Sequence, residues 1–202
     1  MKKGHSEIVF LLDMTGSMAN LVKDTVGGFN TFISEQKKQP GTAELTLAVF
    51  NSDIYKKLID RSDIQSVKEI TQSDYIPNGM TPLLDAVGNT IDSVGERLFM
   101  TQDSERPENV IFVIMTDGEE NYSKKFSFQQ IAEKVKHQQD AYNWKFIFMG
   151  ANIDSFASAS SIGIKYDPSF NNVANFVADS RGVGSSYSTI SCSTSSYRKT
   201  SS

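Results

Sequence analysis

The sequence has little cysteine and no long apolar run near its start. Its single cysteine, Cys192, excludes an intrachain disulfide and indicates a reducing compartment. The first apolar run, residues 8–12, is followed directly by Asp13. A signal-peptide core needs roughly 7–15 apolar residues and a membrane-spanning helix about 20. We therefore expect a cytoplasmic protein without a membrane partner.

Concentrated positive charge is also missing. The 20 Lys and Arg residues are outnumbered by 24 Asp and Glu, which gives a net charge of −4. The basic residues are scattered and form only short pairs, such as Lys37-Lys38 and Lys124-Lys125. Binding to nucleic-acid phosphates needs a concentrated basic face, so nucleic acid is not the expected main partner. With 202 residues, 39% of them hydrophobic, the chain has the size and composition of one globular domain.

Short apolar runs alternate with longer amphipathic stretches, and this alternation predicts an α/β fold with a mostly parallel sheet. We expect strands over residues 8–12, 45–50, 54–59, 110–115, 144–149 and 162–166. We expect helices over residues 17–38, 83–98, 127–137, 155–160 and 171–178. The first strand is continuously apolar, as expected for a central strand covered on both faces. The short polar segment 51–53 predicts an antiparallel hairpin between the second and third strands.

The composition changes at Ser180, after which Ser, Thr, Gly and Tyr dominate. We therefore expect one domain over residues 1–179 and a Ser/Thr/Gly-rich C-terminal tail over residues 180–202. We interpret the tail as disordered, because it has few apolar residues with which to form a core. The alternative is that an assembly orders it.

Oxygen-bearing side chains cluster around three of the predicted loops. Asp13, Thr15 and Ser17 come directly after the first strand. Asp117 comes directly after the fourth strand, and Thr81 lies just before the second helix. In an open parallel sheet, ligands bind beyond the carboxyl ends of the strands. If the first and fourth strands are neighbours, both carboxylates reach the same crevice.

The chemistry of these five side chains points to a hard divalent cation. All offer oxygen, and none offers sulfur or imidazole, so zinc and copper are poor candidates. Oxygen-only ligation with few carboxylates suits Mg²⁺, with Mn²⁺ or Ca²⁺ as substitutes. If Asp117 reaches the metal only through water, one direct carboxylate remains and the ion stays electron-poor, so that it accepts a carboxylate from outside. We therefore expect a protein partner that presents an Asp or Glu to the metal.

These residues resemble the metal-ion-dependent adhesion site of the von Willebrand A and integrin I-domain family. The family pattern is Asp-x-Ser-x-Ser, followed by a distant Thr and then a distant Asp. Asp13, Thr15 and Ser17 in the segment DMTGS match its first part, with Thr in place of the first Ser. Thr81 in GMTPL matches the middle element, and Asp117 in TDG matches the last. The resemblance extends over residues 6–178.

The resemblance implies a Rossmann-like sheet of about six strands, five parallel and one antiparallel, with helices on both faces. It also implies a non-catalytic, Mg²⁺-dependent protein-binding module. In this family, a shift of the last helix changes how the distant Thr and Asp reach the metal. Within the family, the chain is similar to small stand-alone bacterial and phage members, including those of tellurium-resistance-type operons.

Four of the five residues have a simpler interpretation. Asp13 and Ser17 suit helix caps, and Thr81 suits a cap before Pro82. Asp117, which precedes a glycine, suits a turn. We favour a metal site over these interpretations, because all five residues occur together and in order.

Other polar residues are not expected to act at the site. Glu119, Glu120 and Asn121 follow Asp117 and are expected to form a solvated loop on its rim. His5 and His137 lie far from the crevice in sequence, and we expect both at the surface.

Two other functions stay open as alternatives. The first is an Mg²⁺-dependent phosphoryl-transfer enzyme, because phosphatases of the haloacid-dehalogenase type also begin with a strand that ends in Asp. They need a second Asp two residues later as general acid, where this chain has Thr15. There is also no Ser-His-Asp arrangement and no Walker-type loop, so we predict no enzymatic activity. The second alternative is a structural component of a phage or bacterial assembly, held through the C-terminal tail.

Overall fold

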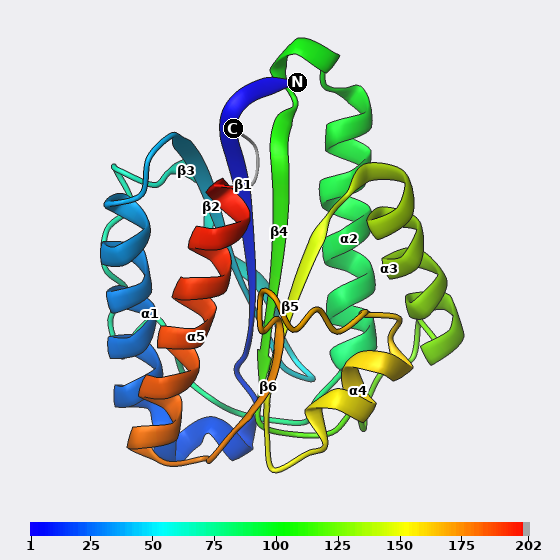
Figure 1. Ribbon diagram of the computed structural model, residues 1–202. Helices are drawn as coiled ribbons and strands as arrows, with labels where there is room; N and C mark the ends of the chain where they lie inside the picture. Colours follow the sequence, from blue (N-terminus) through cyan, green and yellow to red (C-terminus); the bar gives the residue numbers. More distant parts are fainter. Residues whose placement is uncertain (200–202) are drawn as a thin grey trace.

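The computed structural model describes residues 1–199 and shows an open α/β domain (Figure 1). Six strands form one sheet in the order β3-β2-β1-β4-β5-β6. The strands are β1 (Lys2–Asp13), β2 (Thr42–Phe50), β3 (Tyr55–Asp63), β4 (Pro107–Thr116), β5 (Lys145–Ala151) and β6 (Val173–Phe176). All neighbouring pairs are parallel except β2 and β3. The predicted fold class and the predicted antiparallel hairpin are therefore confirmed.

Helices cover both faces of the sheet, as predicted. They are η1 (Gly16–Leu21), α1 (Val22–Lys37), α2 (Leu83–Met100), η2 (Asp103–Glu105), α3 (Phe128–Tyr142), α4 (Ser155–Ser161) and α5 (Ser180–Lys199). In Figure 1, α1 and α5 lie on one face, and α2, α3 and α4 lie on the other. None of the helices in residues 1–199 combines the length and apolarity that crossing a lipid bilayer requires.

The central strand β1 supplies both cores. Side chains alternate between the two faces of a strand, so Ile8, Phe10 and Leu12 pack against α1 and α5. Val9 and Leu11 point to the opposite face and pack in the core beneath α2 and α3. The continuous apolar run noted in the sequence therefore reflects burial on both faces, as predicted.

The predictions between α4 and α5 are wrong. Residues 162–166 form no strand, and residues 173–176 form β6 where a helix was expected over residues 171–178. Gly163 has a φ of +82°, a left-handed conformation that interrupts an extended chain. The Asn172 side chain donates to the carbonyls of Phe146 and Lys165, at 2.9 and 3.0 Å, and so closes this connection against β5.

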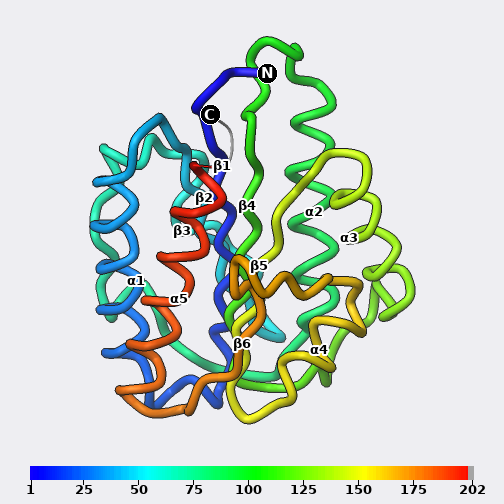
Figure 2. The backbone as a smooth tube through the Cα atoms, viewed as in Figure 1, coloured from blue at the N-terminus to red at the C-terminus, as the bar shows by residue number. Residues whose placement is uncertain are grey.

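The prediction of a disordered tail is also wrong for the part of the tail that the structure describes. Residues 180–199 form helix α5, which lies beside α1 (Figure 2), and residues 200–202 lie outside the described residues. Val183, Tyr187 and Ile190 are buried in the core between α5 and the sheet. The Arg198 guanidinium donates to the Gln36 carbonyl at 2.8 Å. The helix thus packs on its own domain, and no assembly is needed to order it.

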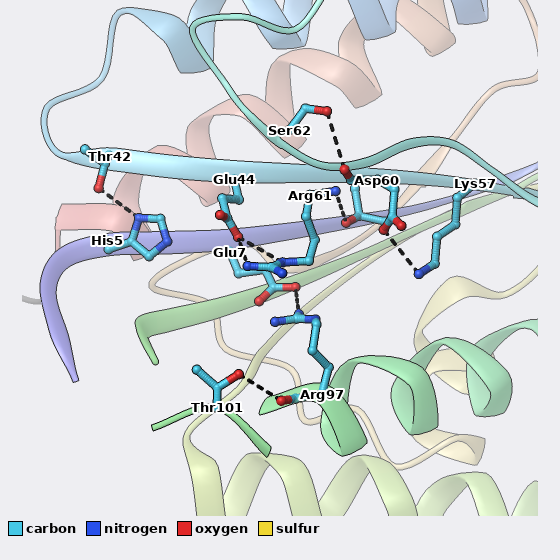
Figure 3. A network of polar contacts seen from close by, with 11 residues as sticks. His5, Glu7, Thr42, Glu44, Lys57, Asp60, Arg61, Ser62, Arg97 and Thr101 are labelled. Atoms are coloured by element: carbon cyan, nitrogen blue, oxygen red, sulfur yellow. Dashed lines mark hydrogen bonds and ion pairs between the residues drawn. The ribbon is translucent and has the colours of Figure 1, made fainter. Parts of the chain in front are cut away.

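A network of charged residues stabilises the end of the sheet where β1 and β2 begin (Figure 3). Glu7 is buried and forms an ion pair with Arg97 of α2. Nearby, Arg61 of β3 pairs with Glu44 at 2.9 Å. His5, expected at the surface, is buried instead, and its Nδ1 lies 2.8 Å from Thr42 Oγ1. Burial lowers the pKa of His5, which favours the neutral ring.

Candidate metal centre

The carboxyl ends of β1 and β4 bring Asp13 and Asp117 to the same edge of the sheet. The two strands are adjacent and parallel, with Leu12 opposite Met115 at the last pair. The strand order also reverses at β1, because β2 and β3 lie on one side of it and β4, β5 and β6 lie on the other. This is the position at which open α/β sheets bind ligands. The neighbouring strands that the prediction required are therefore present.

Four of the five predicted ligands form one hydrogen-bonded chain. The Thr15 backbone N–H donates to Asp13 Oδ1 at 2.7 Å. The hydroxyl oxygens of Thr15 and Ser17 lie 3.0 Å apart, and the Ser17 hydroxyl donates to Asp117 Oδ1 at 2.5 Å. Asp13, Thr15 and Asp117 are buried, whereas Ser17 is exposed. The group therefore opens to solvent on the side of Ser17.

Thr81 reaches the same group from a third loop. A Cβ atom placed on Gly118 would lie 3.4 Å from Thr81 Oγ1 and 3.8 Å from Ser17 Oγ, so all three lie close together. The loops are joined by two bonds between Thr81 and Asn121: Thr81 N–H donates to Asn121 Oδ1 at 2.9 Å, and Asn121 N–H donates to the Thr81 carbonyl at 3.1 Å. The structure thus places the Thr81 hydroxyl beside the side chains contributed by β1 and β4.

The helix-cap interpretation of Asp13, Ser17 and Thr81 is wrong. The N-cap residues of η1, α1 and α2 are Thr15, Leu21 and Pro82, and none of these three forms a side-chain capping bond. The hydroxyls of Ser17 and Thr81 therefore lie at the site and do not cap a helix. Metal coordination by the five residues stays a prediction that this arrangement favours.

The segment after Asp117 is more than a solvated loop. The Glu120 carboxylate accepts hydrogen bonds from the backbone N–H groups of Leu84, Tyr122 and Ser123, at 2.9, 2.8 and 2.6 Å. With Asn121 bonded to the Thr81 backbone, this segment fixes the start of α2 against the end of β4. Glu119 and Asn121 are both exposed, but only Glu119 makes no such contact to the Thr81 loop in the described chain.

Sequence reasoning missed two residues that hold Asp13. The buried Thr116 hydroxyl donates to Asp13 Oδ2 at 2.6 Å, so both carboxylate oxygens accept a hydrogen bond. Its place next to Asp117 in the TDG segment was the available signal. The second is Tyr75, whose hydroxyl donates to the Asp13 backbone carbonyl. Nothing in the local sequence around Tyr75 indicates that contact.

The two carboxylates carry charge that the protein does not neutralise. Burial raises the pKa of Asp13 to about 6, although hydrogen bonds from Thr116 and Thr15 oppose the rise and the nearby Asp117 adds to it. Burial also raises the pKa of Asp117. Within residues 1–199, no ion pair involves either group. A cation at this position would remove the cost of ionising both side chains.

The donor set fits a hard divalent cation. It consists of two carboxylates and three hydroxyls, which are the oxygen ligands that Mg²⁺ and Mn²⁺ accept. The part of the chain that the structure describes contains no cluster of three or more His, Cys, Asp or Glu side chains suited to a metal. Ligation here therefore depends on the hydroxyls of Thr15, Ser17 and Thr81 as well as on the carboxylates.

The protein is thus an open α/β domain in which oxygen-bearing side chains lie together at the carboxyl ends of the central strands. A family model described as the von Willebrand factor type A domain matches residues 7–180. The chain belongs to this family. Domains of this family typically bind protein ligands, and they are usually non-catalytic binding modules.

Three solved structures show the same fold. Manganese-loaded TRAP protein of Plasmodium vivax is 17% identical, with a TM-score of 0.60, over 92% of this chain and 72% of that one. Proximal thread matrix protein 1 of the mussel byssus is 13% identical, with a TM-score of 0.61, over 96% and 46%. A von Willebrand factor type A protein of Catenulispora acidiphila is 11% identical, with a TM-score of 0.54, over 93% and 42%. The chain thus spans less than half of the latter two. No curated protein sequence matches it.

Proposed function

We propose that this domain is a divalent-metal-dependent protein-binding module. Its metal-ion-dependent adhesion site holds Mg²⁺ through the oxygens of Asp13, Thr15, Ser17, Thr81 and Asp117, and the ion coordinates an Asp or Glu of a partner protein. The observation that carries the proposal is the chain of carboxylate and hydroxyl groups in which the charges of Asp13 and Asp117 are unpaired. The similar TRAP protein is manganese-loaded, which supports a divalent cation as the ion that this domain binds.

The protein's own residues hold the ligands before the ion arrives. Thr116 and the Thr15 N–H fix the two oxygens of Asp13, and Ser17 fixes one oxygen of Asp117. Such outer contacts set the orientation of metal ligands and their affinity for the ion. When bound, the ion supplies positive charge and an exchangeable coordination position. If Asp117 reaches the ion only through water, one direct carboxylate remains on the protein side, and that position keeps affinity for a carboxylate from outside.

Exposed apolar side chains around the site support a protein as the source of that carboxylate. Ile54, Ile76, Met80 and Tyr122 are 45, 66, 46 and 39% exposed. Their loops are tied to the metal loops: Met80 N–H donates to Ser52 Oγ, and Gly16 N–H donates to the Gly79 carbonyl, both at 3.1 Å. Exposed apolar groups beside a polar site are typical of a protein-binding surface. We therefore propose a partner segment in which apolar residues flank the Asp or Glu.

Three finer assignments are part of the proposal and have their own tests. We propose that the domain lacks catalytic activity, which a generic phosphatase assay checks: turnover that Asp13→Asn abolishes would contradict it. We propose a cytoplasmic location, which cell fractionation checks. We propose a relationship to small bacterial and phage members of tellurium-resistance type, because the sequence resembles theirs. The identity of captured partners tests this relationship.

Affinity capture tests the proposed function. The wild-type domain is immobilised with Mg²⁺ or with EDTA, and an Asp13→Ala variant is immobilised with Mg²⁺. We expect a partner that is retained only by the wild type in Mg²⁺. Replacing the partner's contacting Asp or Glu by Asn or Gln should then abolish retention. Capture that persists in EDTA and in the Asp13→Ala variant would show that binding does not use the metal site.

A further inference from the structure

Tyr75 occupies an unusual position for a residue outside regular secondary structure. It lies in segment 64–82, which connects β3 to α2 without a helix or strand. Its side chain is fully buried and is the largest among the fully buried side chains of the domain. A long irregular connection in a compact domain is commonly functional. The position of Tyr75 therefore calls for a specific contact, and the structure provides one.

The Tyr75 hydroxyl donates a hydrogen bond to the backbone carbonyl of Asp13. Asp13 is the last residue of β1, and the pairing of β1 with β4 ends one residue earlier, at Leu12. On the other side, Met14 N–H donates to the Phe50 carbonyl at 2.9 Å. The 13–14 peptide is trans and planar, so the Asp13 carbonyl points away from β2. Tyr75 thus bonds to this peptide on the side that faces away from β2, where the pairing of β1 with β4 has already ended.

We infer that Tyr75 is a positioning residue of the metal centre, a role that rests on the proposed metal-binding function. The peptide that it holds joins Asp13 to the segment carrying Thr15 and Ser17. A rotation of this peptide would move the Asp13 carboxylate and the Thr15 N–H that bonds to it. By fixing the peptide, Tyr75 keeps Asp13, Thr15 and Ser17 in one arrangement, and it does so from the connection that also carries Thr81. Loss of an outer contact of this kind lowers metal affinity by about 10–100-fold.

The segment around Tyr75 is itself firmly held, so the contact is built into the fold. The Asn30 side chain of α1 bonds to both backbone groups of Ile70, at 2.9 and 3.0 Å. The Lys37 ammonium donates to the Val67 carbonyl at 2.8 Å. These bonds tie the segment to α1 at two of its buried apolar residues, both of which precede Tyr75 in the chain. Burial also raises the pKa of Tyr75 further above its usual value, so its hydroxyl keeps its proton at neutral pH.

Tyr187 of α5 offers a matched control. Its side chain is buried in the same core as Tyr75, and its ring stacks on Phe10 with centroids 6.0 Å apart. Its hydroxyl, however, has no hydrogen-bond partner in the described chain. Replacement of either tyrosine by phenylalanine removes one buried oxygen from the same core. Only Tyr75→Phe removes a bond to a proposed metal ligand.

Titration with Mn²⁺, followed by electron paramagnetic resonance of the free ion, compares the wild type with the two variants. We expect Tyr75→Phe to raise the Kd for Mn²⁺ by about tenfold, whereas Tyr187→Phe leaves it unchanged. Urea unfolding in EDTA measures the stability of each metal-free protein in parallel. We also expect the Thr15 amide of metal-free Tyr75→Phe to exchange its hydrogen faster than in the wild type.

Each other outcome overturns the inference. Equal Kd values for Tyr75→Phe and the wild type, or a Tyr75→Phe chain that does not fold, would give Tyr75 a purely structural role. An increase in Kd that Tyr187→Phe reproduces would be a general effect of the core. A wild-type domain that binds no Mn²⁺ would overturn the proposed function as well, so the failures of the two proposals are distinguishable.

Discussion

The Ser17 hydroxyl donates to Asp117 Oδ1 at 2.5 Å and joins two segments that lie 100 positions apart in the chain. One segment follows β1 and the other follows β4, so the bond spans the switch point of the sheet. Ser17 is exposed and Asp117 is buried. The bond therefore lies where the proposed metal centre meets solvent, and it satisfies the Asp117 carboxylate when no ion is present.

Replacement of Ser17 by alanine should affect the metal and leave the fold intact. The variant loses a hydroxyl ligand and leaves the Asp117 carboxylate without its bond, so we expect Mn²⁺ affinity to fall by about tenfold or more. Although Ser17 is exposed, its bond serves a buried carboxylate, so the free energy of unfolding in EDTA should fall by about 1–3 kcal/mol. Mn²⁺ titration and urea unfolding measure the two quantities. Ser34→Ala, at an exposed position of α1, is the control and should change neither.

Metal binding and stability should depend on pH in opposite directions. The pKa of Asp13 is about 6 in the folded protein and 3.8 ordinarily, so between these values the folded state binds more protons than the unfolded state. The metal-free protein should therefore lose stability as pH rises from about 4 to 6, by about 3 kcal/mol for this shift. Mn²⁺ needs the ionised carboxylate, so its affinity should fall as pH drops below about 6.

Urea unfolding in EDTA at several pH values, together with Mn²⁺ titrations at the same values, tests this account. Asp13→Asn is the control, because it cannot titrate and should flatten the part of the stability profile that Asp13 produces. A metal-free wild type whose stability rises steadily from pH 4 to 6 would show that Asp13 ionises without cost in the folded state.

Two adjacent glycines of α1 should respond in opposite ways to alanine. A Cβ on Gly28 would lie 2.2 Å from the Tyr187 ring of α5, whereas a Cβ on Gly27 meets nothing within 4 Å. We expect Gly28→Ala to lower the free energy of unfolding by about 2 kcal/mol, because the ring has to move. Gly27→Ala should raise it by up to about 1 kcal/mol, because alanine favours the helix. Chemical denaturation measures both, and a Gly28→Ala protein as stable as the wild type would contradict the close packing of α1 and α5.

The ion pair between Glu7 and Arg97 should matter far more than its exposed neighbour. The Glu7 side chain is 1% exposed, so Arg97→Met leaves a buried carboxylate without its partner, and we expect a loss of about 3–5 kcal/mol. Arg61 and Glu44 are 45% and 27% exposed, so Arg61→Met should cost less than about 1 kcal/mol. Thermal and urea unfolding check both values. Metal affinity should not change in either variant, because Glu7 lies about 20 Å along β1 from Asp13.

Most of the fold was predictable because its strands are buried on both faces. The apolar runs that form β1, β4 and β5 are buried on both faces only in the centre of a sheet that helices cover on both sides. The prediction failed beyond α4, where the short strand β6 depends on pairing with β5 and on the bonds of Asn172. Neither contact leaves a periodic pattern in the local sequence.

Composition misled the prediction for α5, although periodicity could have corrected it. Its buried residues recur at helical spacing: Val183, Ser186, Tyr187, Ile190, Ser193, Thr194 and Tyr197. Several of them are small hydroxyl residues, which lower the mean hydropathy but allow α5 to lie close to α1. A composition that favours disorder therefore concealed an amphipathic helix.

The site was predictable to the extent that its ligands follow strand ends in a recognisable order. Asp13, Thr15, Ser17 and Asp117 lie together because β1 and β4 are neighbours. The residues that hold these ligands were not predictable in the same way. Tyr75 reaches Asp13 only through the tertiary packing of segment 64–82, and Glu120 acts through backbone groups of α2.

The central claim is that one divalent ion binds at Asp13, and calorimetric titration of Mg²⁺ into the metal-free domain tests it most directly. We predict one Mg²⁺ site per wild-type chain and no measurable binding to Asp13→Asn, a variant that keeps the shape of the side chain and removes its charge. Equal binding by the two proteins, or no binding by the wild type, would contradict the claim.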